Sequence, residues 1–407
     1  MLVLVAAWLH RELLLGALPA TGDHLCHMFK GWLMADRLVP SGRVSGWSHL
    51  SFAGYPAGLY YPVGGDLYLT ALRYLSLGLV SWERIYGLGL FGVLVAAPLA
   101  VCTLARRCTG TAGALAGGLL ELGDLGGGRQ GGSVFTVYWG VWPYMLAVSL
   151  SLVALALLPE ALGRPSRERP LPVLLLAALL ALAVLTHPMA AIFLAVAVPL
   201  YMVARGVARR RVEHQAPVYG RAVAAGSLAV ALALFWLLPQ LRTGVEMTES
   251  FGEPWMGLGT LLSRLVTNRA FDKFSNYSWA LGLAGIPLAF ISRRLDRCYP
   301  ALLLAALILI AGAGGEALGT KVQMERISAF MKGVWFVLAA LAVDRLLAGA
   351  RWTAGKIIRR RMPSSLGRVI EPLLGLLVGA SLLIAGWEDH YSRVGRFRPL
   401  ADATWED

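Results

Sequence analysis

The segment ATGDHLCHMFKGWLMADR, residues 20–37, places an acid, two histidines and a lysine just after an apolar N-terminus. A helix that begins near Thr21 or Asp23 would separate apolar from polar residues. Its apolar side holds Leu25, Met28, Phe29 and Trp32, and its other side holds Asp23, His27, Lys30 and Arg37. This pattern is typical of an amphipathic helix in the membrane interface, where the polar side meets lipid phosphates.

Structural roles also account for these polar residues. Asp23 suits the N-cap of such a helix, and a carboxylate fixed by capping is already oriented for catalysis. His24 and His27 are residue types that bind metals, but no third ligand follows at a suitable spacing. Contact with water at a helix surface is the commoner reason for such histidines.

The composition indicates an integral membrane protein. Hydrophobic residues make up 57% of the 407 residues and charged residues only 15%, which is unusual for a soluble domain. The net charge of +13 does not indicate a nucleic-acid partner, because the basic residues gather in loops between apolar runs. The cysteines lack metal-binding or redox spacing, so we expect no disulfide framework. They are Cys26, Cys102, Cys108 and Cys298.

About eleven apolar runs predict an all-α, polytopic transmembrane bundle. They lie at 1–19, 85–105, 111–123, 140–158, 171–187, 188–204, 222–239, 277–292, 299–314, 329–347 and 370–387. The first run is interrupted by His10, Arg11 and Glu12, which are costly in hydrocarbon. Basic residues fill five loops, at 106–107, 164–169, 205–211, 293–297 and 351–361. By the positive-inside rule these loops are cytoplasmic, which places the N-terminus inside a cytoplasmic-membrane protein.

The alternate loops hold most of the acids and should face the outside or the periplasm. The first outer loop, 20–84, is longer than a connection needs, so we expect a functional segment with interfacial helices. The second outer loop is 123–139, and a third, lid-like outer loop is 240–276. We therefore expect one transmembrane domain over 1–387 and a short outer tail over 388–407.

Several motifs carry a resemblance to a known class of enzyme. The first motif is an acid followed by a histidine after the first run, and a tryptophan comes about twenty residues later. The segment GYPAGLYYP is next, and GVWPYMLAVSLSL, THP and ERISAF follow it in that order. In this order they resemble the membrane family labelled "6-pyruvoyl-tetrahydropterin synthase related", which is similar to the integral-membrane glycosyltransferases of the GT-C class. The resemblance covers about four-fifths of the chain. Many such enzymes carry a large outer C-terminal domain, and because about 20 residues follow the last run we do not expect acceptor selection by such a domain.

The resemblance implies a glycosyltransferase that moves a hexosyl or pentosyl group from a polyprenyl-phosphate carrier to a glycan, lipid or protein acceptor at the outer membrane face. Asp23 matches the first-loop acid of the family and is assigned as general base. The residues assigned to the substrate or its phosphate are His24, His27, Lys30, Tyr55, Tyr61, Arg129, His187 and Arg326. For the tyrosines an interfacial belt is the alternative, and for His187 a hydrogen-bonded turn.

The second outer loop adds Glu121 and Asp124 as possible second acids. If Asp23 and Asp124 converge, a divalent cation, Mg²⁺ or Mn²⁺, would bridge them to the phosphate. A solvated, glycine-rich loop is the alternative.

The lid-like loop contains an apolar stretch near 256–266 that predicts an interfacial helix over the cleft. The competing function is a transporter or flippase of lipid-linked or small polar substrates. Transporters often carry internal repeats, and this sequence shows none.

Overall fold

Apolar runs fold into long helices in this chain because only intrahelical hydrogen bonds satisfy the backbone away from water. The computed structural model describes residues 1–19, 21–50, 54–59, 61–126, 130–163, 170–209, 216–243, 256–272, 274–291, 294–314, 324–358, 377 and 381. Within these ranges six helical segments are long and apolar enough to cross a membrane. They are α5 (Trp82–Ala105), α8 (Trp142–Gly163), α10 (Met189–Arg209), α11 (Ala216–Thr243), α14 (Leu295–Leu309) with the π-turn η4 (Ile310–Gly314), and the 3₁₀-turn η5 (Met324–Ile327) with α16 (Ser328–Ile358).

Three shorter apolar helices complete the bundle: α6 (Thr111–Leu122), α9 (Leu171–Thr186) and α13 (Asn276–Ile291). The all-α prediction is therefore confirmed, whereas the count of about eleven spans is not. The first expected span is divided at His10 into α1 (Leu2–Leu9) and α2 (Arg11–Leu14), where the charged pair Arg11 and Glu12 follows. The last, 370–387, lies outside the described residues except for positions 377 and 381.

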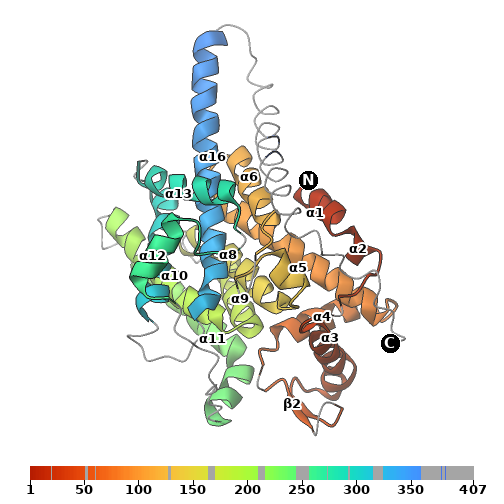
Figure 1. Cartoon of the computed structure of the whole chain (residues 1–407). Helices are drawn as coiled ribbons and strands as arrows, with labels where there is room; N and C mark the ends of the chain where they lie inside the picture. The colour runs from red at the N-terminus through yellow and green to blue at the C-terminus, as the bar shows by residue number, and fades with distance from the viewer. Residues whose placement is uncertain are drawn as a thin grey trace.

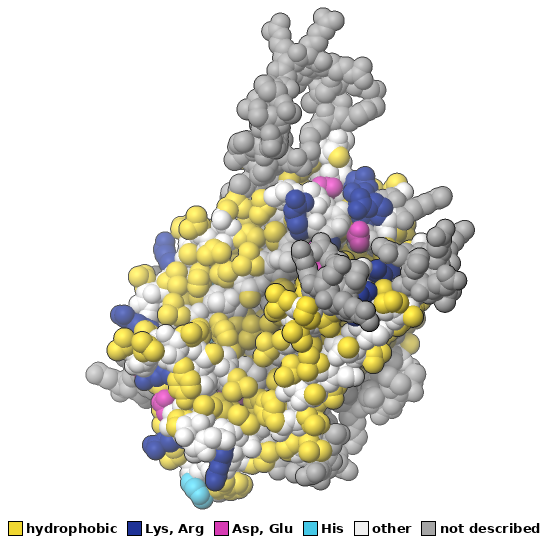
Figure 2. All heavy atoms as spheres, turned by 180° about the vertical axis from the view of Figure 1, so that it is seen from behind, with side chains coloured by type: hydrophobic (Ala, Val, Ile, Leu, Met, Phe, Trp, Pro, Cys, Tyr) yellow, Lys and Arg dark blue, Asp and Glu magenta, His cyan; other side chains and the backbone are white. Residues whose placement is uncertain are grey.

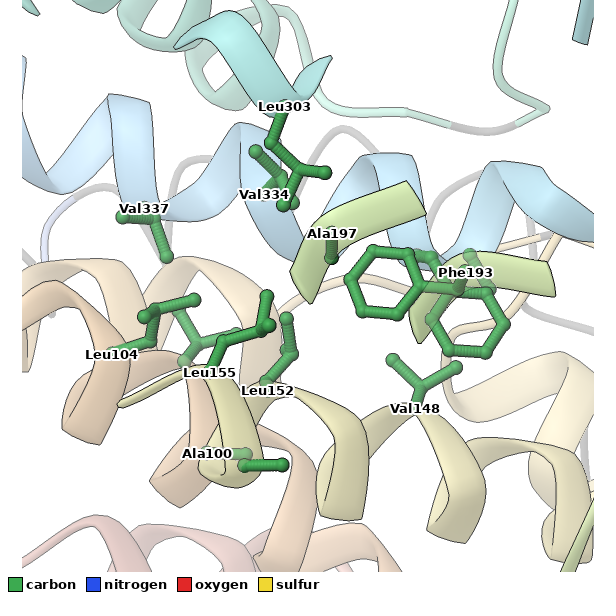
Figure 3. Close-up of a cluster of buried hydrophobic side chains, with 14 of the residues drawn as sticks. Ala100, Leu104, Val148, Leu152, Leu155, Phe193, Ala197, Leu303, Val334 and Val337 are labelled. Carbon is green, nitrogen blue, oxygen red and sulfur yellow. The ribbon is translucent and has the colours of Figure 1, made fainter. Parts of the chain in front are cut away.

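Helix α16 forms the central column of the bundle (Figure 1). It contains 31 residues and is about 46 Å long at 1.5 Å per residue. Every residue from Ile327 to Val343 is buried. In the core around it, Leu104 of α5, Leu155 of α8 and Val337 of α16 lie close together (Figure 3).

Glycines on two neighbouring helices let α16 approach closely. A Cβ atom at Gly117 of α6 would lie 2.8 Å from Ala340 Cβ, and one at Gly285 of α13 would collide with the carbonyl oxygen of Leu338. Any larger residue at either position would push α16 away. The missing side chains at Gly117 and Gly285 therefore allow α16 to pack closely against both helices.

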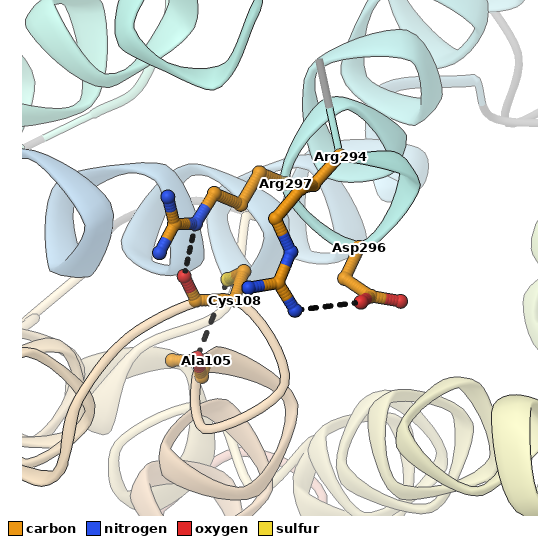
Figure 4. Close-up of polar contacts among 5 residues, drawn as sticks. All are labelled: Ala105, Cys108, Arg294, Asp296 and Arg297. Atoms are coloured by element: carbon orange, nitrogen blue, oxygen red, sulfur yellow. Dashed lines mark hydrogen bonds and ion pairs between the residues drawn. The ribbon is translucent and has the colours of Figure 1, made fainter. Parts of the chain in front are cut away.

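Described residues in or near several basic loops contact one another at one end of the bundle, which we call the basic end. Arg107 Nη1 donates to Glu160 Oε1 at 2.9 Å, and Arg297 Nε donates to the carbonyl oxygen of Cys108 at 3.0 Å (Figure 4). Asp344 Oδ1 accepts the backbone N–H of Gly110 at 2.8 Å. The sequence-based grouping of these loops on one side is consistent with these contacts.

The opposite end, which we call the site end, carries the long first loop. Its elements are α3 (His24–Leu33), the π-turn η1 (Met34–Leu38), the 3₁₀-turn η2 (Val39–Ser41), the hairpin strands β1 (Gly46–Ser48) and β2 (Tyr55–Ala57), and α4 (Gly64–Leu75). The strands pair antiparallel, with Trp47 opposite Pro56. In Figure 1, α3, α4 and β2 lie far from the projecting end of α16.

Two further short helices are α7 (Ser133–Val137) in the second loop, which packs against α5 and α8, and α12 (Leu258–Val266) in the lid-like loop, which packs against α14 and η4. The helix predicted near 256–266 is confirmed, with Leu261 and Leu265 buried. Hydrophobic side chains cover most of the face shown in Figure 2, and charged side chains lie mainly toward its margins. A surface of this kind suits contact with lipid.

Candidate functional site

Helix α3 turns its histidines toward the protein, not toward water. His24 and His27 are buried at 1% and 3% exposure, while Leu25 is 48% exposed. The predicted helix is thus correct, but His27 does not face the lipid headgroups with the polar side, and neither histidine lies at a water-exposed surface. The reason is that the ring nitrogens of His24 form hydrogen bonds inside the bundle, and the ring of His27 packs against aromatic rings there.

His24 is held by a buried chain of hydrogen bonds. Its Nε2 lies 2.6 Å from the carbonyl oxygen of Val137, which can only accept, so Nε2 carries the proton. Its Nδ1 then accepts from the Tyr86 hydroxyl at 2.7 Å, and that hydroxyl accepts from Trp142 Nε1 at 2.9 Å. Burial lowers the His24 pKa to about 4, partly offset by the bond to Val137. His24 therefore positions α3 against α5 and α8.

Asp23 is fixed by its backbone to the end of the second loop. Its N–H donates to the carbonyl oxygen of Trp139 at 3.0 Å, and Thr21 Oγ1 donates to that of Tyr138 at 2.7 Å. Gly140, at φ +74°, fits so tightly here that a Cβ atom would lie 2.7 Å from the backbone N of His24. The Asp23 side chain is exposed and makes no capping hydrogen bond, although it precedes α3. Its carboxylate is thus not used for capping.

Tyr61 is the centre around which the predicted residues gather. Its ring centroid lies 5.6 Å from that of His27 and 4.4 Å from Lys30 Nζ. Burial raises the Tyr61 pKa, and the positive charge of Arg326 opposes this rise, while Asp66 and Asp23 add to it. Charged residues at or in α3, α4 and η5 therefore all influence the pKa of the Tyr61 hydroxyl.

Lys30 lies between two tyrosines. Its Nζ is 5.7 Å from the ring centroid of Tyr55, in addition to its contact with Tyr61. Burial lowers the Lys30 pKa, but interactions with Tyr55, Cys26 and Asp66 outweigh burial and raise it overall. Lys30 thus remains a cation at neutral pH. His27 is different, because burial and then the charge of Lys30 lower its pKa to about 3. It is a neutral residue between the rings of Tyr61 and Trp142.

Asp66 belongs to this cluster and was missed in the sequence. It lies in the first turn of α4 at 4% exposure. Burial raises its pKa to about 7, with Lys30 opposing the rise. The sequence signal was its place in GYPAGLYYPVGGD, directly after the motif that supplied Tyr55 and Tyr61.

His187 and Arg326 come together at the site end, as expected for residues of neighbouring loops. Arg326 Nη1 lies 3.3 Å from His187 Nε2, and the backbone N–H of Met189 donates to His187 Nδ1 at 3.2 Å. Burial and the charge of Arg326 lower the His187 pKa to about 3. Helix α4 is adjacent, since a Cβ atom at Gly64 would lie 2.7 Å from the backbone N of Thr186.

Glu121 and Asp124 occupy a separate buried cluster. Asp124 forms an ion pair with Lys332 of α16, whose side chain is 2% exposed. Both acids line small cavities together with Gln130, Gly132 and Met145. The sequence signal for Lys332 was its position as an ionisable residue inside the apolar run 329–347, and the sequence analysis did not use this signal.

The described residues do not fit the divalent cation expected between Asp23 and Asp124. Among them no group of three or more His, Cys, Asp or Glu side chains is arranged to hold a metal ion. In addition, the ammonium of Lys332 already supplies a positive charge at Asp124 and opposes a second cation there. Arg129, the remaining predicted phosphate ligand, lies outside the described residues.

Comparison with known proteins identifies the family. A model described as "Family of unknown function (DUF6541)" matches residues 15–406. The chain belongs to this family. No curated protein matches the DUF6541 chain.

Solved structures share the fold of this DUF6541 protein. The archaeal oligosaccharyltransferase AglB from Archaeoglobus fulgidus, in complex with an inhibitory peptide and a dolichol-phosphate, aligns with a TM-score of 0.56 at 13% identity. That alignment covers 96% of this chain and 55% of AglB, so the chain spans about half of the length of that protein. ArnT from Cupriavidus metallidurans in the apo state aligns with a TM-score of 0.56 at 14% identity, covering 95% of this chain and 73% of ArnT.

ArnT bound to undecaprenyl phosphate is also similar, with a TM-score of 0.53 at 14% identity, covering 96% of this chain and 70% of that one. The expected resemblance to GT-C glycosyltransferases is thus supported for the fold. The name "6-pyruvoyl-tetrahydropterin synthase related" is not supported by the family match.

Proposed function

We propose that this DUF6541 protein is a membrane glycosyltransferase that moves a sugar from a polyprenyl-phosphate carrier to an acceptor hydroxyl. The observation that carries the proposal is the gathering of Asp23, Lys30 and Arg326 around Tyr61 at one end of a helical bundle. An acid and two cations are what this transfer requires. The fold similarity to AglB and ArnT supports the same reaction class.

In this mechanism Asp23 takes the proton from the acceptor hydroxyl. The acceptor oxygen then forms a bond to the anomeric carbon of the sugar, and the bond between that carbon and the phosphate oxygen breaks. The electron pair leaves with the phosphate. The exposed Asp23 carboxylate is open to an acceptor, while its backbone is fixed to Trp139, so the base is both accessible and oriented.

Lys30 and Arg326 stabilise the negative charge that develops on the departing phosphate. Arg326 offers a planar set of donors suited to phosphate, and Lys30 is a point charge held by aromatic rings. Tyr55 and Tyr61 border Lys30 and would contact the sugar or the phosphate. The basic end would face the cytoplasm and the site end the outside or periplasm, by the distribution of Lys and Arg.

The test is transfer from a polyprenyl-phosphate sugar to an acceptor in proteoliposomes. With Asp23→Asn we expect a loss of about 100-fold or more, the size of a general-base contribution. Asp36→Asn is the matched control, because Asp36 lies in the same loop and its carboxylate accepts from Trp82 Nε1 at 3.0 Å. Full activity of Asp23→Asn would remove Asp23 as the base. Chelator should leave transfer unchanged, because Lys332 already neutralises Asp124.

A further inference from the structure

The turn that joins α4 to α5 exposes three large apolar side chains. Leu75, Leu77 and Leu79 are 80%, 82% and 85% exposed. No charged residue lies in the segment 75–80, which we call the leucine turn. An apolar cluster of this kind is unfavourable in water, so on a protein surface it marks a contact with lipid or with another protein.

The leucine turn adjoins a membrane span. Only Ser81 separates it from Trp82, where α5 begins, and α5 is long and apolar enough to cross a membrane. Trp82 Nε1 donates to Asp36 Oδ2 at 3.0 Å, and the Arg73 guanidinium lies 5.6 Å from the centroid of the Trp82 ring. An indole with polar partners at the beginning of a span is typical of the membrane interface. This position puts the leucine turn near the boundary between lipid headgroups and acyl chains.

The backbone of the leucine turn satisfies its own hydrogen bonds. The N–H groups of residues 76–79 all donate to carbonyl oxygens of residues 72–76, over 2.9–3.3 Å. Arg73 Nη1 donates to the carbonyl oxygen of Gly78 at 3.0 Å and to that of Val80. Water would satisfy these groups in a solvated turn, but the lipid core offers no hydrogen-bonding partner, so a turn that enters lipid has to satisfy them internally. These bonds therefore suit a turn in an apolar environment.

Leu77 has a backbone conformation whose cost the protein itself does little to offset. Its φ angle is +51°, in the left-handed region where glycine and asparagine are favoured. Because the side chain is 82% exposed, its contacts within the described part of the chain contribute little against this cost. Contact with lipid would offset it, since the transfer of a leucine side chain from water to an apolar phase is favourable.

We propose that the leucine turn inserts into the lipid leaflet at the site end, with its three leucines among the acyl chains and Arg73 at the level of the headgroups. Lipid is favoured over a protein partner because α5 continues from this turn as a membrane span. Insertion anchors α4, whose first turn carries Asp66, at the membrane surface. The inference does not depend on the proposed transfer reaction.

Spin-label accessibility in nanodiscs tests the position of the turn. A nitroxide is attached at Leu79→Cys in the full chain after the four native cysteines have been replaced by alanine, and a label at Arg43→Cys is the control. Arg43 is also exposed and lies in the same first loop, between η2 and β1. Oxygen, which concentrates among acyl chains, should relax the label at position 79 more than a water-soluble nickel chelate does, and at position 43 the order should reverse. A nickel preference at both positions would overturn the proposal, and exclusion of both reagents at position 79 would overturn it in favour of a protein partner.

Photolabelling of the unmodified protein gives a second readout that needs no variant to fold. A phospholipid that carries a diazirine on one acyl chain should label residues 75–80 and leave residues 41–45 unlabelled, and a lack of label on 75–80 would refute insertion. Leu77→Asn then tests the side chain, because asparagine tolerates the left-handed conformation and the fold should be retained. We expect the leucine turn of this variant to receive at least about 3-fold less label, because a polar side chain replaces a leucine in lipid. Equal labelling of Leu77→Asn and the wild type would also count against the proposal.

Discussion

The close fit between Gly140 and the start of α3 predicts that adding one methyl group at position 140 will lower the transfer rate much more than the backbone strain alone would explain. In Gly140→Ala the new Cβ atom would lie 2.7 Å from His24 N and 2.9 Å from Asp23 N, at a residue with φ +74°. The left-handed conformation alone costs roughly 1–2 kcal/mol for alanine. Displacing Asp23 also weakens its 3.0 Å bond to Trp139, which contributes about 1 kcal/mol.

Gly42→Ala is the matched control for this change. Gly42 has nearly the same backbone conformation, with φ +72°, but nothing lies within 4 Å of the position that a methyl group would take there. Both variants should lose roughly 1–2 kcal/mol of unfolding free energy from the backbone conformation. Only Gly140→Ala should lose more, to a total of about 2–3 kcal/mol, because only there does the methyl group displace the backbone of Asp23 and its hydrogen bond.

Gly140→Ala and Gly42→Ala should differ more in their transfer rates than in their unfolding free energies. If Asp23 is the base as proposed, a shift of about 1 Å in its carboxylate lowers the rate about 100-fold, so we expect that loss in Gly140→Ala and near wild-type transfer in Gly42→Ala. The measurements are thermal unfolding in nanodiscs and initial transfer rates at a temperature where both variants remain folded. Equal rates for the two variants would refute the reasoning that this junction positions Asp23.

Two other features give measurable expectations. Lys332→Met should destabilise the protein by about 3–5 kcal/mol, because it leaves the Asp124 carboxylate buried without its cation, and the double variant with Asp124→Leu should recover most of that loss in thermal unfolding; no recovery would argue against the pair. Burial raises the Asp66 pKa to about 7, so its folded state favours the protonated form, and unfolding free energy should fall as pH rises from about 4 and level off above about 7. Asp66→Asn should remove this pH dependence of the unfolding free energy, which is on the order of 3 kcal/mol between pH 5 and pH 8. If the unfolding free energies of Asp66→Asn and the wild type change with pH in parallel, the assignment is contradicted.

The bundle could be predicted from the sequence because hydrophobicity over long runs is a strong, local signal. The runs near 85–105, 140–158 and 329–347 appear as α5, α8 and α16, and each helix begins close to the predicted start. The first run was predicted as one span although His10, Arg11 and Glu12 interrupt it, and in the structure α1 ends at this interruption. Local composition cannot show whether a charged interruption is tolerated.

The sequence predicted which residues belong to the candidate site better than it predicted the contacts that they make. Asp23, Lys30, Tyr61 and Arg326 follow from motifs. In the structure Lys30 lies against the Tyr61 ring, and the charges of Asp23 and Arg326 influence the pKa of Tyr61. His24 was expected to meet substrate, but it bonds to Tyr86, which is 62 residues away in the chain. Sequence periodicity carries no information on such distant pairs.

The central column of the fold has a consequence for how the protein is made. Gly117 of α6 and Gly285 of α13 both pack closely against α16, the last long helix in the described part of the chain. During synthesis α6 and α13 are therefore made before the helix that covers these two glycines. We expect a chain that ends before residue 328 to leave both glycine surfaces uncovered and to be less stable than the full chain.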